Sequence, residues 1–231
     1  MHTKSESAIG KIAQAIAHIP EYKKFHEYCL MKEEGFTRMS TVPLTQFINE
    51  AKTWPLEKRI EFFTTLQLLF TQHNGYDANP YPLEANLKMP MLEEWMEKEP
   101  YNPAPFSWYG SETGSMSHIK KALSLDPYHQ QSLLTIIQRY LGHLWTGSCH
   151  LPDYYVGNAE RDLALAEKTQ GYISKLNIEH LKVQLQKELN KSTVLLQNYL
   201  DFKHSSIESF SLWGKLNHKD FSPDRQTTEL V

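Results

Sequence analysis

The sequence is poor in the features that mark membrane-spanning, nucleotide-binding and disulfide-stabilised proteins. It holds no apolar run near the roughly 20 residues that cross a bilayer as a helix, so we expect no membrane contact. Glycine supplies only 10 of the 231 residues, which disfavours a glycine-rich nucleotide fold or a turn-rich all-β fold. The only cysteines, Cys29 and Cys149, lie far apart, and two free thiols are a simpler interpretation than one disulfide.

The sequence also lacks an excess of basic charge. Lysine and arginine total 24 residues against 27 aspartates and glutamates, which gives a formal net charge of -3. Without a basic excess, nucleic acid is not expected as a partner. The N-terminal residues lack the continuous apolar core and the cleavage site of a signal peptide, and this predicts a cytoplasmic protein.

Apolar residues recur at helical spacing along most of the chain, and no convincing alternating strand is present. We therefore predict an all-α fold, built as antiparallel helix pairs in two layers. The expected helices cover residues 5–19, 20–35, 43–53, 55–73, 91–98, 107–123, 127–145, 159–176, 178–204 and 207–216.

Pro80, Pro82, Pro90, Pro100, Pro103 and Pro105 interrupt this pattern within residues 76–106. Proline cannot continue a helix in its interior, because it lacks the N–H group and its ring clashes with the preceding turn. We expect residues 1–231 to form a single helical domain, with a sub-boundary between two halves in segment 76–106.

One junction predicts a helix end followed at once by a new helix. Ala122 and Leu125 close an apolar helix face, and Asp126 can accept hydrogen bonds from the free N–H groups of the next helix. Pro127 suits the first position of that helix. The junction predicts two packed antiparallel helices.

This junction resembles the boundary between two tetratricopeptide repeats, over about one repeat of sequence. The residues that carry the resemblance are Ala122, Leu125, Asp126, Pro127, Leu134, Tyr140 and Gly142. The resemblance implies tetratricopeptide-like packing in the second half. Together with the segment His150–Gly157, the junction also resembles a group of bacterial helical proteins, which implies a related fold and a bacterial origin but no activity.

The loop 146–158 collects several chemically reactive side chains between two helices. Cys149 could act as a nucleophile, with His143 or His150 as its base. His143, Cys149, His150 and Asp153 are also suitable zinc ligands. The structural alternative is that His150 bonds a backbone carbonyl, while Tyr154 and Tyr155 cover the ends of two helices.

A second candidate site is an acidic and aromatic surface in the middle of the chain. Its residues are Glu93, Glu94, Trp95, Glu97, Trp108 and Tyr109. Such a surface can bind a basic protein partner through aromatic anchors and opposite charge. The alternative for Trp95 is that it fills the helical core, because it lies at helical spacing from Leu92.

These observations favour a non-enzymatic, cytoplasmic protein-binding module that needs no cofactor. An immunity-like or antitoxin-like role, in which the acidic surface covers a basic toxin, is one concrete form of this function. The alternative hypothesis is an enzyme or a zinc-binding protein that uses residues 143–155.

Overall fold

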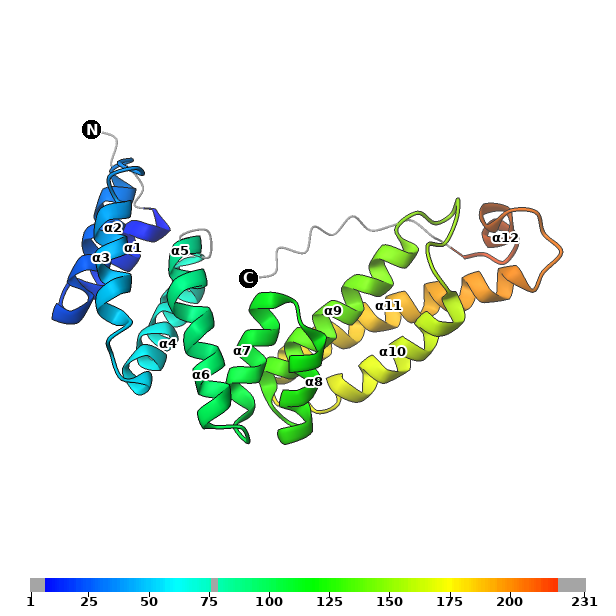
Figure 1. The fold of residues 1–231 in the computed structure, drawn as a ribbon. Helices are drawn as coiled ribbons and strands as arrows, with labels where there is room; N and C mark the ends of the chain where they lie inside the picture. The colour runs from blue at the N-terminus through cyan, green and yellow to red at the C-terminus, as the bar shows by residue number, and fades with distance from the viewer. Residues whose placement is uncertain (1–6, 76–78, 220–231) are drawn as a thin grey trace. The chain divides into compact units, whose positions relative to one another are not determined.

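The computed structural model describes residues 7–75 and 79–219. Within these residues the fold is all-α, without a β-strand, and the predicted fold class is confirmed (Figure 1). The chain divides into two compact units, one that ends at Pro100 and one that begins at Tyr101. This division lies inside the proline-rich segment 76–106.

The N-terminal unit packs α1 against α2 and α4, α2 against α3, and α4 against α6. Its elements are α1 (Ala8–Ile16), a 3-10 turn (Pro20–Tyr22), α2 (Lys23–Glu33), α3 (Thr41–Ala51), α4 (Leu56–His73), α5 (Tyr81–Leu83), a π-helical segment (Glu84–Lys88) and α6 (Met89–Lys98).

Aromatic side chains fill the core of this unit, with Phe62 at the centre. The Phe62 ring lies 4.9 Å from that of Phe47, 5.0 Å from that of Tyr22 and 5.5 Å from that of Phe25. All four side chains are buried. Edge-on and tilted aromatic pairs of this kind stabilise a core beyond the apolar area that they bury.

The helix predicted over 91–98 begins earlier than the prolines suggested. The backbone is helical without a break from Tyr81 to Lys98, through the π-helical segment Glu84–Lys88. Pro82 and Pro90 lie in the first turns of α5 and α6, where a missing N–H costs little. The π-helical turn shifts the hydrogen-bond register just before Pro90, so the chain accommodates this proline without ending the helix.

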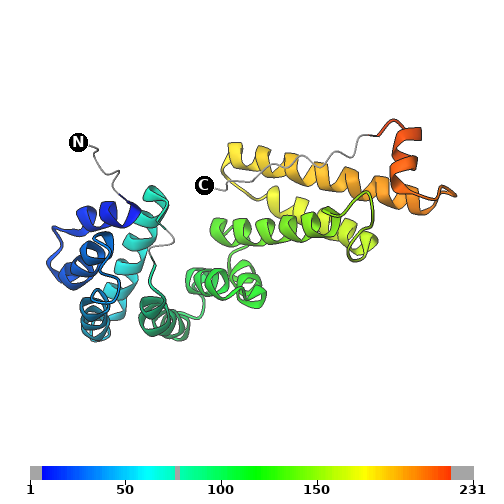
Figure 2. The same cartoon turned by 90° about the horizontal axis from the view of Figure 1, so that it is seen from above.

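In the C-terminal unit, α9, α10 and α11 lie side by side, and α7 and α8 pack as a pair at one end (Figure 2). The helices are α7 (Pro103–Thr113), α8 (Met116–Leu125), α9 (Gln130–Ser148), α10 (Ala159–Ile173), α11 (Glu179–Lys203) and α12 (Phe210–Leu216). The buried core gathers side chains of α8, α9, α10 and α11, among them Ile119, Ile137, Leu144, Ala166, Leu189 and Leu196.

The single helix predicted over 107–123 is two helices, α7 and α8, separated at Gly114. The backbone of Gly114 has a φ of 76°, in the left-handed region that glycine adopts without strain. The Arg139 guanidinium donates to the carbonyl oxygens of Gly114 and Gly110. The end of α7 is therefore satisfied by a side chain of α9.

The capping prediction at Asp126 is wrong in its position. Asp126 accepts a hydrogen bond from the Tyr128 N–H at 2.9 Å and so stabilises the turn. The next helix begins three residues later than predicted, at Gln130, with His129 as its N-cap. A short side chain satisfies the nearest free N–H group, and here that group belongs to the turn before the helix.

Two asparagines near helix starts have different roles. Asn158 is the N-cap of α10, and its Oδ1 accepts from the Arg161 N–H at 2.8 Å. Asn177 does not cap α11, whose N-cap position is Ile178. The Asn177 N–H donates to Gln130 Oε1 at 2.9 Å. α10 runs through Gly171 without splitting.

None of the helices in the described residues combines the length and the apolar content that crossing a bilayer requires.

Candidate functional site

Asp162 lies at the centre of the polar network that joins α9, α10 and the loop between them. It belongs to the first turn of α10, whose N-terminus Asn158 caps. Asp162 is 5% exposed, which is unusual for a carboxylate. The partial positive charge at a helix N-terminus favours a negative side chain there.

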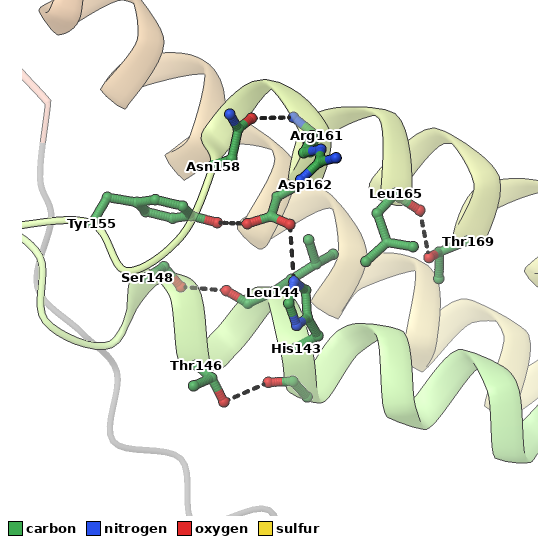
Figure 3. A network of polar contacts seen from close by, with 11 residues as sticks. His143, Leu144, Thr146, Ser148, Tyr155, Asn158, Arg161, Asp162, Leu165 and Thr169 are labelled. Carbon is green, nitrogen blue, oxygen red and sulfur yellow. Dashed lines mark hydrogen bonds and ion pairs between the residues drawn. The ribbon is translucent and has the colours of Figure 1, made fainter. Parts of the chain in front are cut away.

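Two side chains contact the two oxygens of the Asp162 carboxylate (Figure 3). The Tyr155 hydroxyl donates to Oδ2 at 2.6 Å, and His143 Nε2 lies 2.9 Å from Oδ1. The network therefore connects α9, the loop and α10. The sequence identified His143 and Tyr155 as notable, but it did not identify Asp162.

Close backbone packing holds Tyr155 in this place. A Cβ atom on Gly147 would lie 2.5 Å from the Tyr155 hydroxyl oxygen, so this approach requires glycine. The Val156 N–H donates to the Gly147 carbonyl oxygen at 2.9 Å. The loop is thus tied to the end of α9 by its backbone as well as by its side chains.

Burial raises the pKa of Tyr155, and the hydrogen bond to Asp162 raises it further. A phenol with a raised pKa stays protonated at neutral pH and acts as a hydrogen-bond donor. Tyr155 therefore fits a role in holding the loop.

The residues of the predicted nucleophile site make separate contacts. The Cys149 thiol donates to the Thr146 carbonyl oxygen, with 3.2 Å between sulfur and oxygen. The His150 ring stacks on the Tyr154 ring, with centroids 4.9 Å apart and planes at 11°. His143 bonds to Asp162, so none of the described hydrogen bonds joins Cys149 to either histidine.

The structure does not assemble the predicted zinc ligands either. Across residues 7–75 and 79–219, no group of three or more histidine, cysteine, aspartate or glutamate side chains is arranged to hold a metal ion. His143, Cys149 and His150 are close in sequence, but their side chains contact Asp162, the Thr146 carbonyl oxygen and the Tyr154 ring, respectively.

The six residues of the predicted acidic surface belong to both units. Glu93 and Glu97 are exposed, whereas Trp95 is 8% exposed and lies in the core of the N-terminal unit. Trp95 is thus a correction to the predicted surface. Trp108 and Tyr109 lie on α7 of the C-terminal unit and are half-buried, and the Tyr109 ring packs 4.5 Å from that of His118.

Glu94 forms ion pairs with two basic side chains of its own unit. It lies 2.5 Å from an Arg59 nitrogen and 2.8 Å from Lys98 Nζ. Hydrogen bonds from Lys98 and from Arg59 lower the pKa of Glu94. The Arg59 side chain is mostly buried, so the Glu94 carboxylate compensates a guanidinium charge that is largely removed from solvent. Glu94 therefore has a structural role.

Comparison with protein-family models, with curated proteins and with solved structures finds no match for this chain. Its resemblance to tetratricopeptide repeats stays a prediction. The function has to follow from the chain's own geometry.

Proposed function

We propose that the chain is a non-enzymatic protein-binding module of the cytoplasm, and that the end of α9 with the loop 149–158 forms a contact surface. A surface that binds well presents rigid aromatic anchors, because little freedom is then lost on binding. The observation that carries the proposal is a loop held from within by buried contacts while its outer side chains are exposed.

The inner side of the loop is anchored at several points. Tyr155 bonds to Asp162, and its ring lies 5.2 Å from the ring of Tyr199 on α11. Leu151 is buried with Phe210 and Trp213 of α12.

Large side chains of the α9 end and of the loop are exposed. Trp145 is 67% exposed and Tyr154 is 54% exposed. Tryptophan and tyrosine are the residues most enriched among those that dominate binding energy at interfaces. The sequence resemblance of residues 122–142 to a junction between tetratricopeptide repeats also supports the proposal, since stacked helix pairs of that family form extended binding surfaces.

Capture from the source cell tests this surface. The full chain, a Trp145→Ser/Tyr154→Ser double variant and a Tyr128→Ser control serve as bait. Tyr128 is an exposed aromatic residue of the same unit, outside the loop. A partner retained by the full chain and the control, but lost by the double variant, is expected. Equal capture by all three baits contradicts the proposal.

An immunity-like role against a basic partner is the concrete form that the acidic residues of α6 support. Glu93 and Glu97 are exposed and point to this role, whereas Glu94 is already paired. Glu93→Lys/Glu97→Lys should weaken capture and leave the melting temperature nearly unchanged. Glu94→Lys should lower the melting temperature, because it leaves the Arg59 charge without its carboxylate.

A second candidate function rests on the His143–Asp162 pair. A carboxylate that orients an imidazole is the arrangement of a general base, and the His143 side chain is 61% exposed. The Nδ1 atom of His143 has no hydrogen-bond partner in the part of the chain that the structure describes. Hydrolysis of p-nitrophenyl acetate by the full chain, lost in His143→Asn, would favour this candidate. Equal rates with both proteins would count against it.

A further inference from the structure

A groove on the N-terminal unit lies between the connection of α2 to α3 and residues 79–82. Its volume is about 310 Å³. The lining residues that matter here are Tyr28, Lys32, Thr37, Ser40, Leu44 and Tyr81. This volume is at the lower end of the roughly 300–1,000 Å³ that pockets for drug-sized molecules span, and it suits one or two side chains of a bound segment.

The groove has one cationic side chain and several hydroxyl groups in its lining. Among the described residues that line it, Lys32 is the only charged one and none is a carboxylate. Among the described residues, the Lys32 ammonium, the Thr37 hydroxyl and the Tyr28 hydroxyl have no hydrogen-bond partner. Burial raises the pKa of Tyr28 to about 12, so its hydroxyl remains a donor. Three unused donors around one groove suit an anionic acceptor.

The remaining lining is apolar. Leu44 is buried beneath the groove, and Tyr81 is 78% exposed between Pro80 and Pro82. Aromatic side chains line the grooves in which several domains bind extended peptide segments. Met39 and Val42, both exposed, continue the apolar character along the chain beside Ser40 and Thr41.

We infer that this groove binds an extended segment of a partner protein that carries a carboxylate beside an apolar side chain. The carboxylate contacts Lys32 and Thr37, and the apolar side chain packs on Leu44 and Tyr81. The positive charge of Lys32 and the nearby hydroxyl groups of Thr37 and Tyr28 favour this occupant over a neutral or basic segment. The groove is a separate site from the loop 149–158, so failure of the loop proposal leaves this inference in place.

Selection from random peptides tests the charge preference directly. The full chain and a Lys32→Glu variant are panned in parallel against short peptides displayed on phage, in libraries with a free and with a blocked C-terminus. Peptides with aspartate, glutamate or a terminal carboxylate are expected on the full chain, and peptides with lysine or arginine on Lys32→Glu. The two libraries distinguish a side-chain carboxylate from a chain end.

The affinity of the best selected peptide is then measured by fluorescence anisotropy. Lys32→Gln and Tyr81→Ala should each raise the Kd about tenfold. Lys52→Gln and Leu68→Ala are the matched controls, because both residues are exposed in the same unit and do not line the groove. The controls should leave the Kd unchanged, and circular dichroism should show the same helix content for all variants.

Three outcomes would overturn the inference. They are the absence of any enriched peptide, enrichment without acidic groups, and equal affinity of the full chain and Lys32→Gln. An acetate titration followed by NMR completes the test. Shifts at Lys32 and Thr37 with acetate, without any enriched peptide, would assign the groove to a small free carboxylate and overturn the peptide occupant.

Discussion

The hydrogen bond between Tyr155 and Asp162 requires that residue 147 has no side chain, and the contribution of this packing to stability can be measured. A Cβ on Gly147 would displace the Tyr155 hydroxyl from the carboxylate. Gly147→Ala should lower the free energy of unfolding by about 1–3 kcal/mol, and Tyr155→Phe by about 1 kcal/mol. Urea denaturation measures both values.

The double variant tests whether the two changes act on the same hydrogen bond. Gly147→Ala/Tyr155→Phe should cost less than the sum of the single changes, because the bond that the first change breaks is already absent in the second. Additive losses would mean that the Tyr155 hydroxyl contributes independently of Gly147. Gly171→Ala is the control, since a Cβ at Gly171 meets open space.

The burial of Cys29 and Tyr28 predicts that the free energy of unfolding falls at alkaline pH. Burial raises the pKa of the Cys29 thiol from 9.0 to about 12 and that of Tyr28 from 10.0 to about 12. Above their ordinary pKa values both groups lose their protons only in the unfolded chain, so the unfolded state binds fewer protons and the free energy of unfolding falls as pH rises. Each such group contributes up to about 1.4 kcal/mol per pH unit.

Urea denaturation at several pH values from 8 to 10 measures this slope. In Cys29→Ala the fall that begins near pH 9.0 should be shallower, because the buried thiol is absent. An unchanged slope in this variant would assign the alkaline loss to other groups.

The two thiols should also differ in reactivity. Cys29 is buried and Cys149 is partly exposed, and both are free. A thiolate is the reactive form, and burial suppresses both its formation and its access to reagent. A chromogenic disulfide reagent at neutral pH should therefore titrate Cys149 first and Cys29 only in denaturant. Equal rates in the native protein would contradict the burial of Cys29.

At the scale of the helix, one substitution should have opposite effects at two glycines. A Cβ on Gly110 of α7 would lie 2.7 Å from Ile119 Cδ1 and 3.0 Å from the Ile119 backbone nitrogen, whereas a Cβ on Gly142 of α9 meets nothing within 4 Å. Gly110→Ala should destabilise by about 1–3 kcal/mol, because backbone cannot yield as a side chain can. Gly142→Ala should stabilise by about 0.5–1 kcal/mol through helix propensity.

Thermal melting of both variants checks the two signs. A stabilising Gly110→Ala would mean that α7 and α8 can separate without cost. A destabilising Gly142→Ala would mean that something other than helix propensity governs this face of α9.

The sequence predicted which segments are helical over most of the chain, but it did not predict where several helices begin and end. The 3.6-residue apolar period identifies α4, α9 and α11 directly. The break between α7 and α8 was missed although Gly114, in the left-handed region, is a residue type that commonly ends helices. Arg139 of α9 satisfies the carbonyl oxygens at this end. That contact spans 25 residues and leaves no local signal.

At the scale of the whole molecule, each unit has its own core, and this predicts independent folding. The C-terminal unit buries side chains from α8, α9, α10 and α11 around one centre. A fragment of residues 101–219 should therefore be helical by circular dichroism and should melt cooperatively, as domains with their own core do. A non-cooperative melt would mean that this core needs the N-terminal unit.

The sequence by itself determined the all-α class, most helix positions and the exclusion of a long apolar span. These properties depend on periodicity and composition, which neighbouring residues carry. Only the tertiary structure decided which side chains meet. Asp162 joins His143 across 19 positions, and Arg59 joins Glu94 across 35. Such contacts depend on how the helices pack against one another, and neighbouring residues in the sequence do not reveal that packing.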